Sequence, residues 1–319
     1  MPKVVLPIAN GFYESDSLPI SAQECVNFYP NIAQAPALNQ ETLYGTAGLK
    51  EVANANSLTA SRGAHEMNGV PYFVIAEKLY SMAVDYTLTF IGNIAGTSRV
   101  SMADNGTQLL VLVPNGNGYI YNHVADTFAQ ITDSDFTANG NPQLVVYIDG
   151  FFCLTTDSKK FIVSALNDGL SYNALDFGTA ESDPDEIVAP IVFKNQLFIG
   201  GSQTIEAFQN IGGADFPFQR TGLFLSKGIA SPFSIQSLQG TFVFIGSGQN
   251  ESPAIWAFEG NDAVKISTTA IDKELSNLTQ DQVTSIYSWG YAEKGAYFVG
   301  FALPSSTLVY DIITKRWHE

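Results

Sequence analysis

The stretch Asn105-Gly-Thr-Gln-Leu-Leu-Val-Leu-Val113 holds the pattern that decides the fold. A turn pair, Asn105-Gly106, precedes a run of apolar residues, and another strand-like run follows at Gly118 to His123. Asn-Gly suits a two-residue hairpin because both central positions of such a turn take a positive φ. The stretch therefore predicts antiparallel strands joined by short turns.

The same arrangement of turn, second strand and third strand occurs six times along the chain. The turns lie at Asn68-Gly69, Asn105-Gly106, Asp149-Gly150, Lys194-Asn195, Gln239-Gly240 and Lys294-Gly295. The second strands are expected over 70–75, 108–113, 151–155, 196–199, 241–245 and 296–301. The third strands are expected over 78–84, 118–123, 160–165, 204–209, 254–259 and 307–312.

Successive turns are separated by roughly 40 to 50 residues, a spacing typical of propeller blades with up to four strands each. An irregular β-sandwich is the alternative, but its strands would recur about every 8–12 residues. Neither a Trp-Asp signature nor a Kelch double glycine marks the repeats. We therefore predict an all-β, β-propeller-like fold of about six short antiparallel blades, with an extended N-terminal arm.

The composition supports this fold class and excludes some functions. The 319 residues include 22 Phe, 14 Tyr and 27 Gly, which suits many short strands joined by turns. The net charge is −16 and no run of Lys or Arg is present, so tight charge-driven DNA binding is not expected. No apolar stretch approaches the roughly 18 residues of a membrane span. Pairing of Cys25 with Cys153 stays open, with two buried free thiols as the simpler expectation.

Two segments depart from the repeat. Residues 1–60 are rich in Ala, Asn, Gln and Pro and show little strand pattern after residue 8, so they read as an extended arm before a propeller domain over 61–319. Residues 268–282 lengthen the last spacing, and within them 272–282 read as a short helix with Leu275 and Leu278 three residues apart. Such an insertion is either a surface connection or a contact element at one rim.

A search for chemistry finds no catalytic, cofactor or metal motif. His65, His123 and His318 are far apart in the sequence, without the close spacing of a zinc site. The glycine-rich loops lack a following helix, so they do not predict a phosphate cradle. We therefore expect no enzyme, no cofactor and no metal. A carbohydrate-binding or carbohydrate-active propeller is the alternative function, with Tyr119, Tyr121 or Trp289 stacking on sugars.

A family resemblance rests on two pairs of segments. The first pair is Gln23-Glu-Cys-Val-Asn-Phe-Tyr-Pro30 and Leu43-Tyr-Gly-Thr-Ala-Gly-Leu49. The second pair is Ile255-Trp-Ala-Phe-Glu-Gly260 and Val264-Lys-Ile-Ser-Thr-Thr-Ala-Ile271. These segments resemble the packaged-DNA stabilisation, or tail hub (nozzle), proteins of short-tailed bacteriophages. Members of that family are generally longer, so the resemblance implies either that a C-terminal part is missing here or that this is a shorter member.

The resemblance implies a structural virion protein, made in the host cytoplasm, that assembles below the portal of a phage tail. There it would form a ring, commonly of six copies, that closes the DNA exit channel and stabilises the packaged DNA. The implied partners are the portal or a head–tail adaptor, and the tail needle or fibre proteins, while DNA passes without tight binding. We expect subunit contacts from the arm and the insertion, at Asn27, Phe28, Tyr29, Pro30, Ile271, Leu275 and Leu278.

Overall fold

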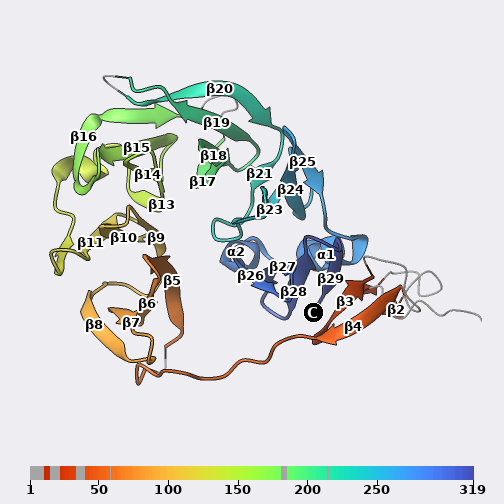
Figure 1. The fold of residues 1–319 in the computed structure, drawn as a ribbon. Coiled ribbons are helices and arrows are strands. Elements are labelled where there is room, and N and C mark those ends of the chain that lie inside the picture. Colours follow the sequence, from red (N-terminus) through yellow and green to blue (C-terminus); the bar gives the residue numbers. More distant parts are fainter. Residues whose placement is uncertain (1–10, 15–21, 34–39, 58, 181–184, 214–215) are drawn as a thin grey trace, which may run out of the picture. The chain divides into compact units, whose positions relative to one another are not determined.

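The computed structural model describes residues 11–14, 22–33, 40–57, 59–180, 185–213 and 216–319 (Figure 1). The chain divides into two compact units. The middle unit runs from Lys50 to Leu225, and the terminal unit combines Met1–Leu49 with Ser226–Glu319. No helix in the described ranges is long and apolar enough to cross a membrane.

The middle unit holds four antiparallel sheets of four strands, each in consecutive order. The first contains β5 (Ser61–Met67), β6 (Val70–Ile75), β7 (Lys78–Met82) and β8 (Leu88–Asn93). The second contains β9 (Ser101–Asp104), β10 (Gln108–Val113), β11 (Asn117–Asn122) and β12 (Thr127–Gln130), followed by a 3₁₀ turn (Ser134–Thr137). The third contains β13 (Pro142–Ile148), β14 (Phe151–Thr156), β15 (Lys160–Ala165) and β16 (Asp168–Thr179). The fourth contains β17 (Ile187–Phe193), β18 (Gln196–Gly201), β19 (Ile205–Asn210) and β20 (Phe218–Leu225).

The terminal unit holds two further blade sheets and two short hairpins. The fifth blade contains β21 (Gly228–Ile229), β22 (Gln236–Leu238), β23 (Thr241–Ser247), β24 (Ala254–Glu259) and β25 (Asp262–Lys265). Helices α1 (Thr269–Ser276) and α2 (Gln280–Ser285) follow it. The sixth blade contains β26 (Tyr287–Glu293), β27 (Ala296–Ala302), β28 (Thr307–Asp311) and β29 (Arg316–His318). The hairpins pair β1 (Tyr13–Glu14) with β2 (Ala22–Gln23), and β3 (Phe28–Ile32) with β4 (Glu41–Gly45).

The six blades confirm the predicted all-β, propeller-like class, and five of the six turns are the expected two-residue hairpins. At Asn68-Gly69, for example, both residues take a positive φ and Met67 pairs directly with Val70. The turn at Asn105 is longer than predicted. The side-chain oxygen of Asn105 accepts hydrogen bonds from the backbone N–H groups of Thr107 and Gln108, and β10 therefore starts only at Gln108.

The second strand of most blades is buried along nearly its whole length, as the apolar runs predicted. A charged residue also lies inside the first blade. Arg62 is 3% exposed, and its guanidinium donates to the carbonyl oxygens of Ala76, Ile94, Ala95 and Ser98. Four backbone acceptors replace a carboxylate partner and hold two loops against β5.

The insertion forms two helices where one was predicted. Thr279 ends the first helical stretch because it caps α2: its hydroxyl accepts from the Gln282 N–H, and the Gln282 side chain accepts from the Thr279 N–H. This reciprocal cap favours a new helix start over a continuous helix.

Candidate assembly site

The N-terminal segment, which carries the two short hairpins, docks on the outer strand of the sixth blade. We call the described residues 11–14, 22–33 and 40–45 the clasp. The Phe12 N–H donates to the Trp317 carbonyl at 2.7 Å. The Asn27 N–H donates to the Glu319 carbonyl at 2.7 Å, and the Glu319 N–H donates to the Cys25 carbonyl at 2.8 Å. Backbone groups at the free edge of β29 thus find their partners in the clasp, which protects this sheet edge.

Tyr29 anchors the clasp in an aromatic cluster. Its side chain is 3% exposed and meets the ring of Phe298 edge-on, with centroids 5.0 Å apart. The His318 ring lies 6.0 Å from Tyr29 and 5.5 Å from Phe298. The Tyr29 hydroxyl and both His318 ring nitrogens are buried without a hydrogen-bond partner among the described residues. Burial lowers the pKa of His318 from 6.5 to about 4, so the ring is neutral near pH 7.

The four predicted contact residues of the arm point in different directions. Tyr29 and Pro30 are buried within the chain, whereas Asn27 and Phe28 are exposed, Phe28 at 49%. Alternation along β3 explains the opposite exposure of Phe28 and Tyr29, because successive side chains of a strand point to opposite faces. Pro30 shares the face of Phe28 but is buried, and it lies close to Gly11. Asn27 takes a φ of 58°, where the chain turns from its pairing with Glu319 into the hairpin.

The three predicted contact residues of the insertion lie in a different cluster. Ile271 and Leu275 on α1 are fully buried in a core that includes Trp317 and strands of the fifth and sixth blades. Leu278 is partly buried against the same core. Tyr29 packs in a separate cluster with Phe298, so the structure does not bring the two predicted groups together. That all seven residues make subunit contacts stays a prediction.

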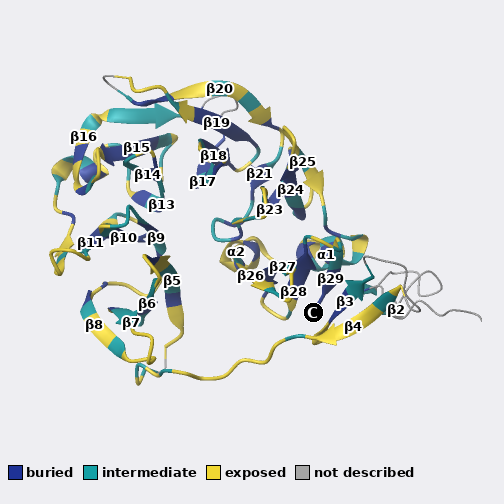
Figure 2. Ribbon diagram, viewed as in Figure 1, coloured by how far each residue is buried: buried dark blue, intermediate teal, exposed yellow. Residues whose placement is uncertain are grey.

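Two exposed residues of β4 were not predicted as contact residues. Leu43 and Tyr44 on β4 are 39% and 43% exposed, although both are large and apolar or aromatic. Figure 2 shows β4 and the segment after it exposed over most of their length. Beside Tyr44, the Lys294 ammonium lies 5.7 Å from the ring centroid, at a cleft of about 260 Å³ between the hairpin and the sixth blade.

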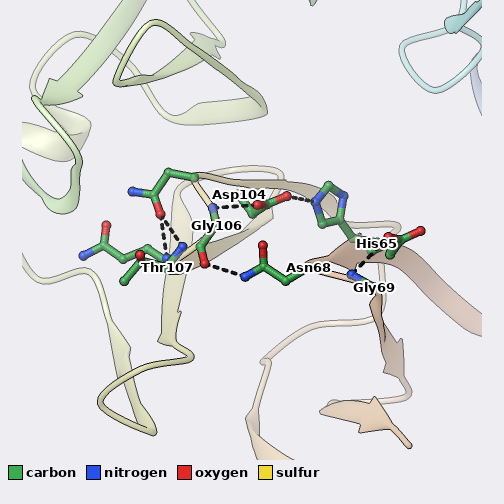
Figure 3. A network of polar contacts seen from close by, with 9 residues as sticks. His65, Asn68, Gly69, Asp104, Gly106 and Thr107 are labelled. Atoms are coloured by element: carbon green, nitrogen blue, oxygen red, sulfur yellow. Dashed lines mark hydrogen bonds and ion pairs between the residues drawn. The ribbon is translucent and has the colours of Figure 1, made fainter. Parts of the chain in front are cut away.

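A His–Asp pair links the first two blades in the middle unit (Figure 3). His65 Nε2 on β5 lies 2.6 Å from Asp104 Oδ2 on β9. Asp104 Oδ1 accepts from the Gly106 N–H, and the Asn68 side-chain amide donates to the Gly106 carbonyl. The polar partners in the network belong to the turns and strands of these two blades, so the pair joins their two hairpin turns.

The other chemical candidates, two cysteines and Asp311, are buried in the described part of the chain. Cys25 and Cys153 are buried free thiols, so they do not pair, and burial raises the pKa of each. No group of three or more His, Cys, Asp or Glu residues there could hold a metal ion. Asp311 is fully buried and accepts from the N–H groups of Ile313 and Thr314.

The aromatic residues that suggested a carbohydrate-binding or carbohydrate-active propeller are largely buried. Tyr119 and Tyr121 are 5% and 9% exposed and pack in the core of the first two blades. Tyr119 stacks on Phe128, with centroids 5.7 Å apart. Trp289 is half-buried over Gly300. The rings of Tyr119 and Tyr121 are therefore occupied by the protein itself, whereas Trp289 keeps part of its surface exposed.

Comparison with known proteins identifies the family. A phage-stabilisation family model, described as "Bacteriophage P22 Gp10, beta-propeller", matches residues 4–318. The chain belongs to this family. The resemblance found in the N-terminal and fifth-blade segments is thereby confirmed, and with it the β-propeller class.

A curated member of the family is similar over most of this chain. The tail hub protein gp10 of Salmonella phage P22 is 26% identical over 296 residues, which cover 84% of this chain and 61% of that protein. The chain thus spans less than two thirds of the relative's length. Among solved structures, a computationally designed protein, Ika8, is similar with a TM-score of 0.50 at 12% identity, covering 92% of this chain and 83% of Ika8. That likeness concerns the fold alone.

Proposed function

We propose that the chain is a structural, non-enzymatic component of a phage tail hub that assembles with copies of itself below the portal and stabilises packaged DNA. The observation that carries the proposal is the family match, which spans residues 4–318 and therefore includes both the clasp and all six blades. Phage P22 gp10 is itself described as a tail hub protein, and its homology supports the transfer of this role.

The proposed mechanism is shape and assembly. Rigid antiparallel blades supply the body, and the clasp and the helix pair supply the subunit contacts. Asn27, Phe28 and Leu278 are the accessible side chains of these contact elements. Tyr29, Pro30, Ile271 and Leu275 would act beneath the surface, by holding these elements in place. The net charge of −16 would keep a channel wall from adhering to DNA, because like charges repel.

The proposed partners are further copies in a ring, a portal or head–tail adaptor protein, and tail needle or fibre proteins. The proposed location is the phage tail of the virion, after synthesis in the host cytoplasm. Mass measurement of the purified chain, alone and mixed with portal rings, tests these assignments. Discrete oligomers, or binding to the portal ring, support the proposal, whereas a monomer that does not bind portal rings contradicts it.

Two variants make the mass measurement specific. Phe28→Ser removes an exposed ring from the clasp, and Phe90→Ser removes a ring of similar exposure (51%) from β8. The clasp variant is expected to lower the oligomer fraction, while the β8 variant leaves it unchanged. Equal loss in both variants would argue against the clasp as a contact element. A band shift at low salt adds a check on DNA, since nanomolar duplex binding would contradict a non-adhesive wall.

A further inference from the structure

The contacts that hold the clasp on the sixth blade would be the same whether the two belong to one chain or to two different chains. Its Cys25 carbonyl and Asn27 N–H bracket Glu319 in the pattern of neighbouring parallel strands. Tyr29 fills the aromatic cluster, and Glu41 lies 3.5 Å from Arg316 at the surface. Backbone pairing, a buried ring and an ion pair together make a specific docking site.

A single exposed segment connects the clasp to the first blade. Residues 46–57 form no helix or strand, and every one of them is exposed or half-buried. The hydrogen bonds within 47–57 are local, such as that from the Asn56 N–H to the Asn54 side chain. Twelve residues in extended form span roughly 40 Å. We call this segment the tether.

Apolar side chains on the tether and the outer hairpin face remain uncovered within the chain. Leu49 is fully exposed, and Val52 is 47% exposed. Phe28 and Leu43 lie on the hairpin face opposite to Tyr29 and are 49% and 39% exposed. Concentration of large apolar groups in one short part of the sequence indicates a surface that another protein covers.

We infer that the clasp is exchanged between copies: the clasp of one copy docks on the sixth blade of the next, and the tether crosses between them. The exchanged clasp makes the same contacts with its neighbour as it makes within its own chain. The equilibrium between the closed and the exchanged forms therefore depends on the effective concentration of neighbouring copies and on the surface that the tether buries between them. A second copy is the occupant because it alone carries the matching docking site. The inference rests on the self-assembly part of the proposed function and specifies its contact.

A disulfide across the docking site distinguishes exchange from closure within one chain. Val26 lies beside Glu319, since its neighbours bracket that residue. Chains carrying only Val26→Cys and chains carrying only Glu319→Cys, differing in tag length, are co-expressed, oxidised and run on a denaturing non-reducing gel. Exchange is expected to give a covalent heterodimer in amounts well above those of either variant alone. The two cysteines placed together in one chain should give covalent multimers.

A matched pair controls for oxidation and folding. Ala302 and Thr307 lie directly opposite on β27 and β28, so cysteines there can close only within one blade. That pair must give a covalent monomer. The inference is overturned if the Val26→Cys, Glu319→Cys double variant also gives only a covalent monomer under the same conditions. Oligomers in the mass measurement together with that result would leave self-assembly standing and remove exchange alone.

Discussion

Acidification should weaken the docked clasp through His318, whose ring is 1% exposed and has no hydrogen-bond partner among the described residues. The pKa of this ring falls from 6.5 to about 4 on folding, because burial disfavours the charged form. The unfolded chain therefore binds more protons between these two values. Stability that is fully present above pH 6.5 is lost as the pH falls towards 4.

The magnitude follows from the two pKa values. Each unit of difference corresponds to about 1.4 kcal/mol, so the full shift is worth about 3 kcal/mol below pH 4. Between pH 7 and pH 5 the loss from this one group is about 2 kcal/mol. His318→Phe keeps an aromatic ring against Phe298 and Tyr29 and removes the titration.

Urea unfolding followed by tryptophan fluorescence at pH 7 and pH 5 measures the difference. The loss of unfolding free energy between the two pH values should be about 2 kcal/mol smaller in His318→Phe than in the unchanged chain. His123→Gln, at an exposed position, is the matched control and should keep the full pH dependence. Equal losses in the unchanged chain and in His318→Phe would refute the reasoning.

Other substitutions test separate parts of the fold. Leu275→Ala should lower the free energy of unfolding by about 2–5 kcal/mol, because it empties a fully buried site under α1, and urea titration measures it. Arg62→Met leaves buried carbonyls of two loops unpaired and should lower stability by about 3 kcal/mol or more, with hydrogen exchange rising first in 94–98. Asp311→Ala removes the side chain that accepts from three donors in the turn before β29 and should lower the unfolding free energy by about 2 kcal/mol, whereas Asp311→Asn should retain part of it.

Local chemistry explains why the blades could be predicted from the sequence. Asn68-Gly69 and Asp149-Gly150 tolerate a positive φ on their own, so their hairpins are specified by two adjacent residues. Strands such as Gln108–Val113 follow at once and are apolar throughout. The break between the two helices was harder to see, because it depends on the side chain of Thr279 competing for its own helix start.

Distant contacts explain why the clasp could not be predicted. Phe28–Ile32 contains Pro30, which weakens a strand pattern, and its pairing with Glu41–Gly45 is stabilised by contacts with the last blade. The family resemblance pointed to Asn27–Pro30 but not to which side chains are buried. The partners of Tyr29 lie far along the chain and carry no complementary motif that spacing could reveal.

Docking of the N-terminal hairpin on the last blade also sets an order of events during synthesis. Tyr29 is made roughly 270 to 290 residues before Phe298 and His318, which at about 5–20 residues per second is a delay of roughly 15 to 60 s. For all of that time the newly made hairpin has no aromatic cluster in its own chain to enter. Contacts between such distant residues also close a large loop, which slows folding. On the ribosome, the clasp emerges before any blade of this chain and is among the last elements to make its native contacts.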